Sequence, residues 1–279
     1  MKNIKWCFKV PAVLMLLLLP ALHIPPSFAA ELTAKDVMVK VDARDTGKTS
    51  IRESTMILID RKNNQRVRQT KQFSKEYGDD TKAISFFLSP ADVKNTSFLS
   101  YNWDDESKED DSWLYLPALR KVKRIASSDK SGSFMGSDFT YADIEGVEIE
   151  DYDYAFVKGK EKEQVAGNPT WVIESRPKKD REKDVIKETG NIKAQLWIRK
   201  DNFMVVQGKF WVKKGKKIKY LTLSEIEKID GIWTAKKMQM VTTKKGKVEH
   251  STVLQSSKIV YNEPMEDEMF TTQRMERGL

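Results

Sequence analysis

NIKAQLWIRKDNFMVVQGKFWVKKGKKIKYLTLSEIEKIDGIWTAKKMQMVTTKKGKVEHSTVLQSSKIV, residues 191–260, is a run of long strand-like segments separated by short polar turns. Turns this tight, rich in Asp, Asn, Gly and Lys, join antiparallel neighbours and not parallel strands with a crossover. The spacing of the segments, at roughly a dozen residues, indicates a meander that curls into a barrel or half-barrel. We predict strands over residues 191–199, 203–213, 217–229, 232–243 and 248–260, with turns at 200–202, 214–216, 230–231 and 244–246.

Further helices and strands are predicted on both sides of this run. Thr33 is suited to cap a helix over residues 34–45, because Val37, Met38 and Val41 share one helical face. The charged run at residues 178–188 predicts an exposed loop, and residues 264–276 a short closing helix that docks on the sheet. Further strands are expected over residues 50–60, 65–77, 84–88, 97–103, 152–160 and 170–177.

Several of these strands carry large apolar side chains on both faces. Ala194, Leu196 and Ile198 alternate with Gln195, Trp197 and Arg199, and Met204 and Phe210 share a face that Gly208 interrupts. Glycine inside a strand often marks the bend that a curled sheet needs. Apolar residues on both faces are explained either by ordinary packing of the core and rim or by a cavity for an apolar ligand.

SWLYLPALRKVKRIASSDKSGSFMGSDFTYADIE, residues 112–145, combines an aromatic strand, a basic arm, a Ser/Gly loop and an apolar segment. Apolar side chains on a loop are unfavourable unless they fold onto an apolar surface. We interpret Phe134, Met135, Phe139 and Tyr141 as a lid that plugs a cavity, with Gly132 and Gly136 supplying backbone freedom. The alternative is a segment that caps the sheet permanently.

The run LYLPALRKVKRI followed by GSFMGSDFTYADIE resembles the outer-membrane lipoprotein-sorting-like proteins of the LolA/LolB superfamily. The resemblance implies a mainly β (α+β) fold: an antiparallel open β half-barrel with short helices forming a lid over an apolar cavity, here over residues 30–279. It implies a periplasmic carrier that sequesters lipid or lipoprotein acyl chains during transport to the outer membrane, served by an inner-membrane transporter and an outer-membrane acceptor. The lipid-binding residues that we predict are Phe134, Met135, Phe139, Tyr141, Trp103, Leu114, Leu116, Leu196, Ile198, Met204 and Phe210.

Residues 1–29 predict a cleaved export signal. Lys2, Lys5 and Lys9 precede a short apolar run, and Ser27-Phe28-Ala29 provides a small-x-small cleavage site. Cys7 lies before the apolar run, where it cannot serve as a lipid-modified cysteine. We therefore expect an exported, soluble protein, a monomer without disulfides.

The residue inventory gives little support to catalysis. Beyond the signal, His250 is the only histidine and no cysteine remains, so we expect neither a metal site, nor a cofactor, nor triad chemistry, and we interpret His250 as a surface residue. The carboxylates from Asp138 to Asp153 could support hydrolysis, but they crowd one loop and helix, where Ser137 or Asp138 could act as a cap. The expected protein is not an enzyme.

Two interpretations remain for charge and for function. Arg120 and Arg124 could contact a phosphate or an acidic partner, or they could form a solvated basic edge. The net charge of +8, with acids well mixed in, is compatible with anionic lipid surfaces and gives no reason to expect nucleic acid. The alternative to a carrier is a periplasmic accessory protein of a membrane transporter or envelope complex, with a cavity filled by side chains.

Overall fold

The strands predicted between residues 191 and 260 are present and are antiparallel neighbours. The computed structural model describes residues 31–105, 107–213 and 217–279, all but Glu31 within one unit, Leu32–Leu279. The expected export signal and the turn at 214–216 lie outside the described residues. Within the described ranges, no helix combines the length and apolar character needed to cross a membrane.

The strands of the described residues form one 14-stranded antiparallel sheet, in the order β6-β5-β4-β3-β2-β1-β14-β13-β12-β11-β10-β9-β7, with β8 paired to β9. Its first half consists of β1 (Thr49–Asp60), β2 (Gln65–Tyr77), β3 (Asp80–Ser89), β4 (Ser97–Asn102), β5 (Asp111–Leu116) and β6 (Lys121–Arg124). Its second half consists of β7 (Tyr152–Phe156), β8 (Gln164–Val165), β9 (Asn168–Pro177), β10 (Asn191–Arg199), β11 (Val205–Val212), β12 (Lys217–Ile229), β13 (Ile232–Lys244) and β14 (Lys247–Tyr261).

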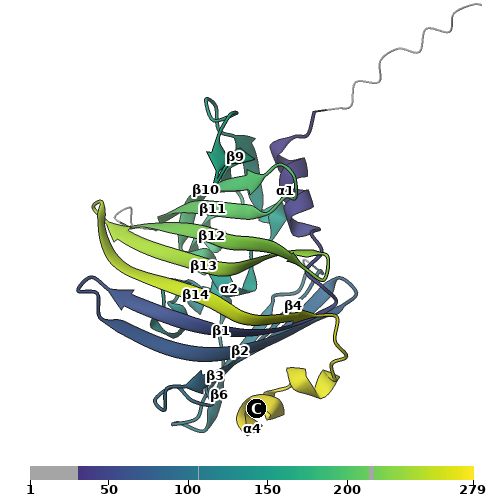
Figure 1. Ribbon diagram of the computed structural model, residues 1–279, viewed down its shortest axis with the longest axis vertical. Coiled ribbons are helices and arrows are strands. Elements are labelled where there is room, and N and C mark those ends of the chain that lie inside the picture. Colours follow the sequence, from purple (N-terminus) through teal and green to yellow (C-terminus); the bar gives the residue numbers. More distant parts are fainter. Residues whose placement is uncertain (1–30, 106, 214–216) are drawn as a thin grey trace, which may run out of the picture. The chain divides into compact units, whose positions relative to one another are not determined.

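The sheet curls without closing. Figure 1 shows the long strands β10 to β14, β1 and β2 in front of α2 (Tyr141–Glu145), with β4 and β6 behind, so that the sheet wraps around this helix. Register shifts between Glu53 and Ser54, and between Thr242 and Thr243, mark bulges that bend long strands. β6 and β7 are the two edges, so the predicted open half-barrel is confirmed.

Short helices pack on the faces of the sheet. The N-terminal helix, α1 (Ala34–Asp42), begins with a capping box in which Thr33 and Asp36 exchange hydrogen bonds, and it buries Val37 and Met38 against the inward-facing Ile173 and Ile198. The other helices are the 3-10 helices η1 (Ser127–Asp129), η2 (Phe134–Gly136), η3 (Ile149–Asp151) and η4 (Asp267–Phe270), and the α-helices α3 (Glu182–Thr189) and α4 (Thr272–Arg277).

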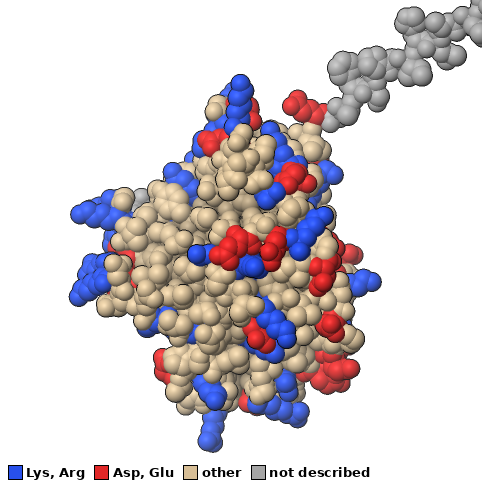
Figure 2. Space-filling view, viewed as in Figure 1, with Lys and Arg blue, Asp and Glu red and all other residues tan. Residues whose placement is uncertain are grey.

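The C-terminal segment covers the outer face of the sheet over β2 to β5, as its predicted docking requires. Phe270 and Met275, at 1% and 0% exposure, pack there against Phe73, Ile84 and Leu99. This cluster accounts for the apolar residues that the first strands carry on both faces, because one set faces α4 and the other faces the interior. Figure 2 shows that Lys and Arg side chains project along the left edge of the view, where hairpin ends lie.

Three local predictions are corrected by the structure. Residues 182–189 are helical, not a loop, because Val185 and Thr189 are buried one turn apart and Gly190 ends the helix in the left-handed conformation. The cap of α2 is Thr140, not Ser137 or Asp138. His250 is not a free surface residue, since its Nδ1 lies 2.6 Å from the buried Asp138 carboxylate. Tertiary partners decide the burial of α3 and the position of His250, whereas the cap of α2 is a local capping box between Thr140 and Asp143.

Candidate functional site: a cavity beneath the lid segment

The lid segment, residues 132–145, is held in shape by its own backbone. Met135 and Gly136 both adopt positive φ, at 50° and 75°, which lets η2 turn back on itself. Phe134 N donates to Phe139 O at 2.7 Å and closes this loop. The following helix, α2, has a capping box in which Thr140 and Asp143 satisfy each other's backbone N–H groups.

The underside of the lid segment is aromatic and buried. Phe134 is 4% exposed, and its ring centroid lies 5.3 Å from that of Phe98 and 5.5 Å from that of Tyr141, both near edge-to-face. Phe139 is 2% exposed in the same cluster. Residues that would be unfavourable on a solvated loop are thus stabilised against the inner face, meaning the face of the sheet turned toward the lid segment.

A cavity of about 390 Å³ lies between the lid segment and the inner face of β1, β2, β13 and β14. Its apolar wall follows the strand register: Met56 pairs with Leu254, Leu254 with Met238, and Met238 with Leu223. Phe134, Phe139 and Ile144 close it from the lid side, and Met204 contributes from the connection between β10 and β11. The lining therefore combines flexible methionines with rings, a composition that suits an adaptable apolar ligand.

Polar contacts tie the lid segment to the sheet. Arg68 Nη1 of β2 donates to Met135 O at 2.6 Å. The Asp138 carboxylate, only 2% exposed, accepts from Thr252 Oγ1 at 2.8 Å and faces His250 Nδ1. Arg68 reaches the lid segment from β2, and Thr252 and His250 reach it from β14. The α2 residue Asp143 also forms an ion pair with Lys219 of β12.

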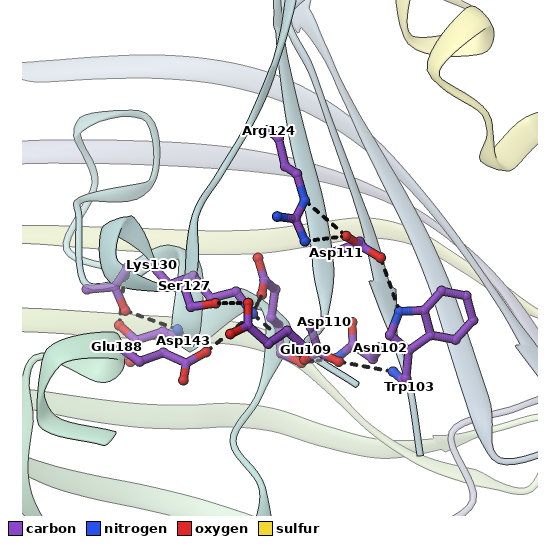
Figure 3. Close-up of polar contacts among 12 residues, drawn as sticks. Asn102, Trp103, Glu109, Asp110, Asp111, Arg124, Ser127, Lys130, Asp143 and Glu188 are labelled. Atoms are coloured by element: carbon purple, nitrogen blue, oxygen red, sulfur yellow. Dashed lines mark hydrogen bonds and ion pairs between the residues drawn. The ribbon is translucent and has the colours of Figure 1, made fainter. Parts of the chain in front are cut away.

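Lys130, just before the lid segment, forms a buried charge cluster with the end of α2 (Figure 3). Its Nζ lies 2.8 Å from Glu145 Oε2, 3.3 Å from Glu188 Oε1 and 3.9 Å from Asp110 Oδ2. Burial alone would lower the pKa of the Lys130 ammonium, but these carboxylates outweigh it and raise the pKa above its usual value. Lys130 therefore stays charged at neutral pH, and its ion pair with Glu145 is made to the last residue of α2.

A larger groove, of about 770 Å³, lies outside the lid, between the loop around residues 107–110 and the region of α3. Charged side chains dominate its lining, among them Asp110, Asp184 and Glu188. Burial raises the pKa of the Asp110 carboxyl. An acyl chain gains nothing from such a wall, so the smaller cavity beneath the lid segment is the candidate site.

Solved structures share both the fold and much of the sequence. A protein domain from Vibrio parahaemolyticus named for outer membrane lipoprotein sorting is 32% identical, with a TM-score of 0.76, over 88% of this chain and 98% of that one. The chain belongs to the family of outer membrane lipoprotein-sorting protein domains. A DUF1329 family protein from Desulfovibrio piger is 31% identical, also with a TM-score of 0.76, over 87% of this chain and 97% of that one.

A solved LolA superfamily protein shares the fold alone. A superfamily protein from Nitrosomonas europaea is 18% identical, with a TM-score of 0.64, over 87% of this chain and 99% of that one. A family described only as an uncharacterized protein matches residues 79–277. No curated protein matches the chain. The resemblance found in the lid region of the sequence is therefore confirmed across most of the chain.

The LolA-like fold places the predicted ligand residues in several environments. Phe134, Phe139 and Met204 line the cavity. Five others pack against the aromatic cluster beneath the lid segment: Leu114, Leu116, Met135, Tyr141 and Phe210. The Phe210 ring lies against the backbone of Gly208. A Cβ at position 208 would lie 2.7 Å from Phe210 Cε2, so a larger residue there would collide with the ring.

The remaining predicted residues lie elsewhere. Leu196 and Ile198 share the inner face but pack beneath α1. Trp103 lines the outer charged groove and its indole Nε1 donates to Asp111 Oδ2 at 3.3 Å. Arg124 forms an ion pair with Asp111 at 2.6 Å, whereas Arg120 is exposed in the turn between β5 and β6. These residues do not line the cavity beneath the lid segment.

Sequence reasoning missed the polar groups that organise this LolA-like site. Arg68 sits in a strand of alternating polar residues, where nothing distinguishes it from Arg66 except that it is 7% exposed in the folded chain. Lys130 appears in a Ser/Gly loop, and its partners come from distant segments. The inward position of Arg68 could have been found from the alternation that puts Met56 and Leu58 inside β1, had the register of β1 and β2 been known.

Proposed function

We propose that the protein is a non-covalent carrier that sequesters the acyl chain of a lipid or lipoprotein beneath the lid segment during transit through the periplasm. The observation that carries the proposal is the cavity of about 390 Å³ with a methionine-rich wall and an aromatic cover. Each methylene withdrawn from water contributes about 0.8 kcal/mol, so an acyl chain is retained only where such a wall surrounds it.

In the proposed carrier, the contacts between the lid segment and the sheet must break before a bound acyl chain can leave. The lid segment is tied to the sheet through a few polar contacts, including those of Arg68 and Asp138, and rests on an aromatic cluster. A chain that displaces Phe134 and Phe139 from the cavity would occupy the same apolar wall that these rings cover. Ligand entry and lid movement are then coupled by competition for one surface.

The test is a pair of substitutions on neighbouring residues of β13. Met238 lines the cavity, whereas Gln239, the next residue, faces the opposite side of the sheet. Met238→Trp should fill the cavity and abolish copurification of lipid, measured by native mass spectrometry, and Gln239→Trp should leave it intact. Both variants must show the wild-type circular dichroism spectrum.

Two results would contradict the carrier proposal. In the first, wild-type protein that was purified without detergent does not bind an added acyl probe. In the second, the Met238→Trp variant binds the probe as well as the wild type does. The first result would favour the interaction-protein alternative, in which the same half-barrel contacts a protein partner and carries no lipid.

A further inference from the structure

The cavity is not uniformly apolar, because the inner face changes character along β1. Met56 belongs to the apolar wall, Ser54 follows two residues earlier, and Arg52 two residues before that, all three lining the cavity. At the rise of an extended strand, Arg52 lies about 13 Å from Met56 along the strand. The cavity therefore has an apolar end beneath the lid segment and a polar end near the connection from α1 to β1.

The polar end is built as rows across the sheet. Ser54 pairs with Thr70 on one side and with Ser256 on the other, where the two hydroxyl oxygens lie 3.2 Å apart. One row further, Arg52 pairs with Gln72, and Gln72 pairs with Ser85. Side chains at these positions face the cavity and not solvent outside the half-barrel, so their polar groups can meet a ligand directly.

Arg52 has no carboxylate partner among the described residues. Its Nη1 reaches Ala235 O and Ser256 Oγ, each at 3.4 Å, which is the long limit for a hydrogen bond. A guanidinium carries five N–H donors in a planar fork suited to a carboxylate or phosphate, so most of its donors remain available. Arg52 is partly buried among uncharged polar side chains, so an anion that enters the cavity meets a guanidinium with free donors.

A second arginine stands at the same end. Arg44 lines the cavity and donates from Nη2 to Trp233 O at 2.9 Å. Of the acids that line the cavity, Asp45 accepts from Gly47 N at 2.9 Å, and Asp143 is paired with Lys219. The third cation of the lining, Lys236, is paired with Glu227 at 3.1 Å. Among the cations of this lining, Arg44 and Arg52 have no ion pair, and Arg52, whose hydrogen bonds are the longer, is the one better placed to bind an incoming anion.

Resting on the proposed function, we infer that the carried molecule is an anionic amphiphile, whose carboxylate or phosphate headgroup binds Arg52 while its acyl chain lies against Met56, Leu254 and Met238. Gln72 and Ser85 donate further hydrogen bonds to the headgroup oxygens. A neutral amphiphile fits the apolar end but leaves Arg52 unsatisfied. Selectivity for negative charge is therefore a property of this chain's own cavity.

Isothermal titration of delipidated protein tests the inference, with three probes of equal acyl length: a fatty acid, a lysophosphatidic acid and a neutral monoacylglycerol, each below its critical micelle concentration. The anionic probes should bind about tenfold more tightly than the neutral one. Arg52→Gln should abolish that difference and leave the affinity for the neutral probe unchanged. Arg52→Lys should retain most of the difference.

The matched control is Lys237→Gln, which removes a positive charge from the neighbouring outward position of β13 and should alter no affinity. Binding of the fatty acid alone, of the lysophosphatidic acid alone or of both, with dependence on Arg52, would support the inference and identify the headgroup. Equal affinity of wild type and Arg52→Gln for the anionic probes would overturn it while leaving the carrier proposal intact. Absence of binding by all three probes would instead remove the carrier proposal on which the inference rests.

Discussion

The Arg68 guanidinium of β2 donates a hydrogen bond of 2.6 Å to the backbone carbonyl of Met135, at the tip of the lid segment. It also lies over the Phe87 ring, 5.8 Å from the centroid. Burial lowers the pKa of Arg68, yet the ordinary value is so high that the side chain stays charged at neutral pH. A charged donor thus joins the lid segment to the wall of the cavity.

Loss of the hydrogen bond between Arg68 and Met135 should speed the exchange of ligand. In Arg68→Gln the charge-assisted bond to Met135 is gone, and a hydrogen bond of this class contributes about 1.5–3 kcal/mol. We expect release of a bound fluorescent fatty acid to accelerate about tenfold or more in stopped-flow measurements. Arg66→Gln, at the exposed position two residues earlier, is the control and should release at the wild-type rate.

Phe134 should matter for stability as well as for closure. Truncation to alanine removes a 4% exposed ring that contacts Phe98 and Tyr141, and such changes cost about 3–5 kcal/mol in buried sites. Urea denaturation should show the lower free energy of unfolding. Bound lipid should return part of the loss by refilling the space, so a variant whose stability is indifferent to added lipid would contradict the plugging role.

The Lys130 cluster predicts strong coupling between two buried charges. Lys130→Met leaves the Glu145 carboxylate, at 1% exposure, without its partner, and a buried charge left in this way costs about 3–5 kcal/mol. Lys130→Met combined with Glu145→Gln should be clearly more stable than Lys130→Met alone, as measured by urea midpoints. Additive effects of the two substitutions would argue against the ion pair.

The C-terminal segment should loosen in acid. Asp267 Oδ1 accepts from Lys75 Nζ at 2.6 Å and from Tyr77 Oη at 2.7 Å, and these hydrogen bonds hold the pKa of Asp267 below its usual value. A carboxyl with a depressed folded-state pKa contributes stability at neutral pH that is lost as the pH falls through that pKa.

The comparison is between wild type and Asp267→Asn in urea. The variant should be less stable at pH 7, and the difference should shrink as the pH falls below 3.8, the usual pKa of an aspartate, and through the lower pKa of the folded wild type. If the difference in stability stays constant across this range, the stabilisation by the hydrogen bonds of Asp267 does not depend on the negative charge of its carboxylate. Glu268→Gln, one residue along η4, serves as the control.

The sequence by itself determined the antiparallel order of β10 to β14, because turns of two to three residues leave adjacent strands no other arrangement. It also determined the capping box of α1 and the aromatic nature of the lid segment. These features depend on neighbours a few residues apart, whose interactions are fixed before any long-range packing. The family resemblance was likewise visible in one continuous stretch, residues 112–145, and did not depend on long-range packing.

Only the tertiary structure decided which inward side chains meet. Arg68 contacts Met135, Asp138 contacts Thr252, and Arg52 is left without a carboxylate because the register of β1, β2 and β14 places hydroxyls and amides beside it. Residues separated by more than two hundred positions share one cavity, and periodicity within a strand does not predict which residue lies opposite on the neighbouring strand. The polar end of the cavity is therefore a product of register, which one strand cannot encode alone.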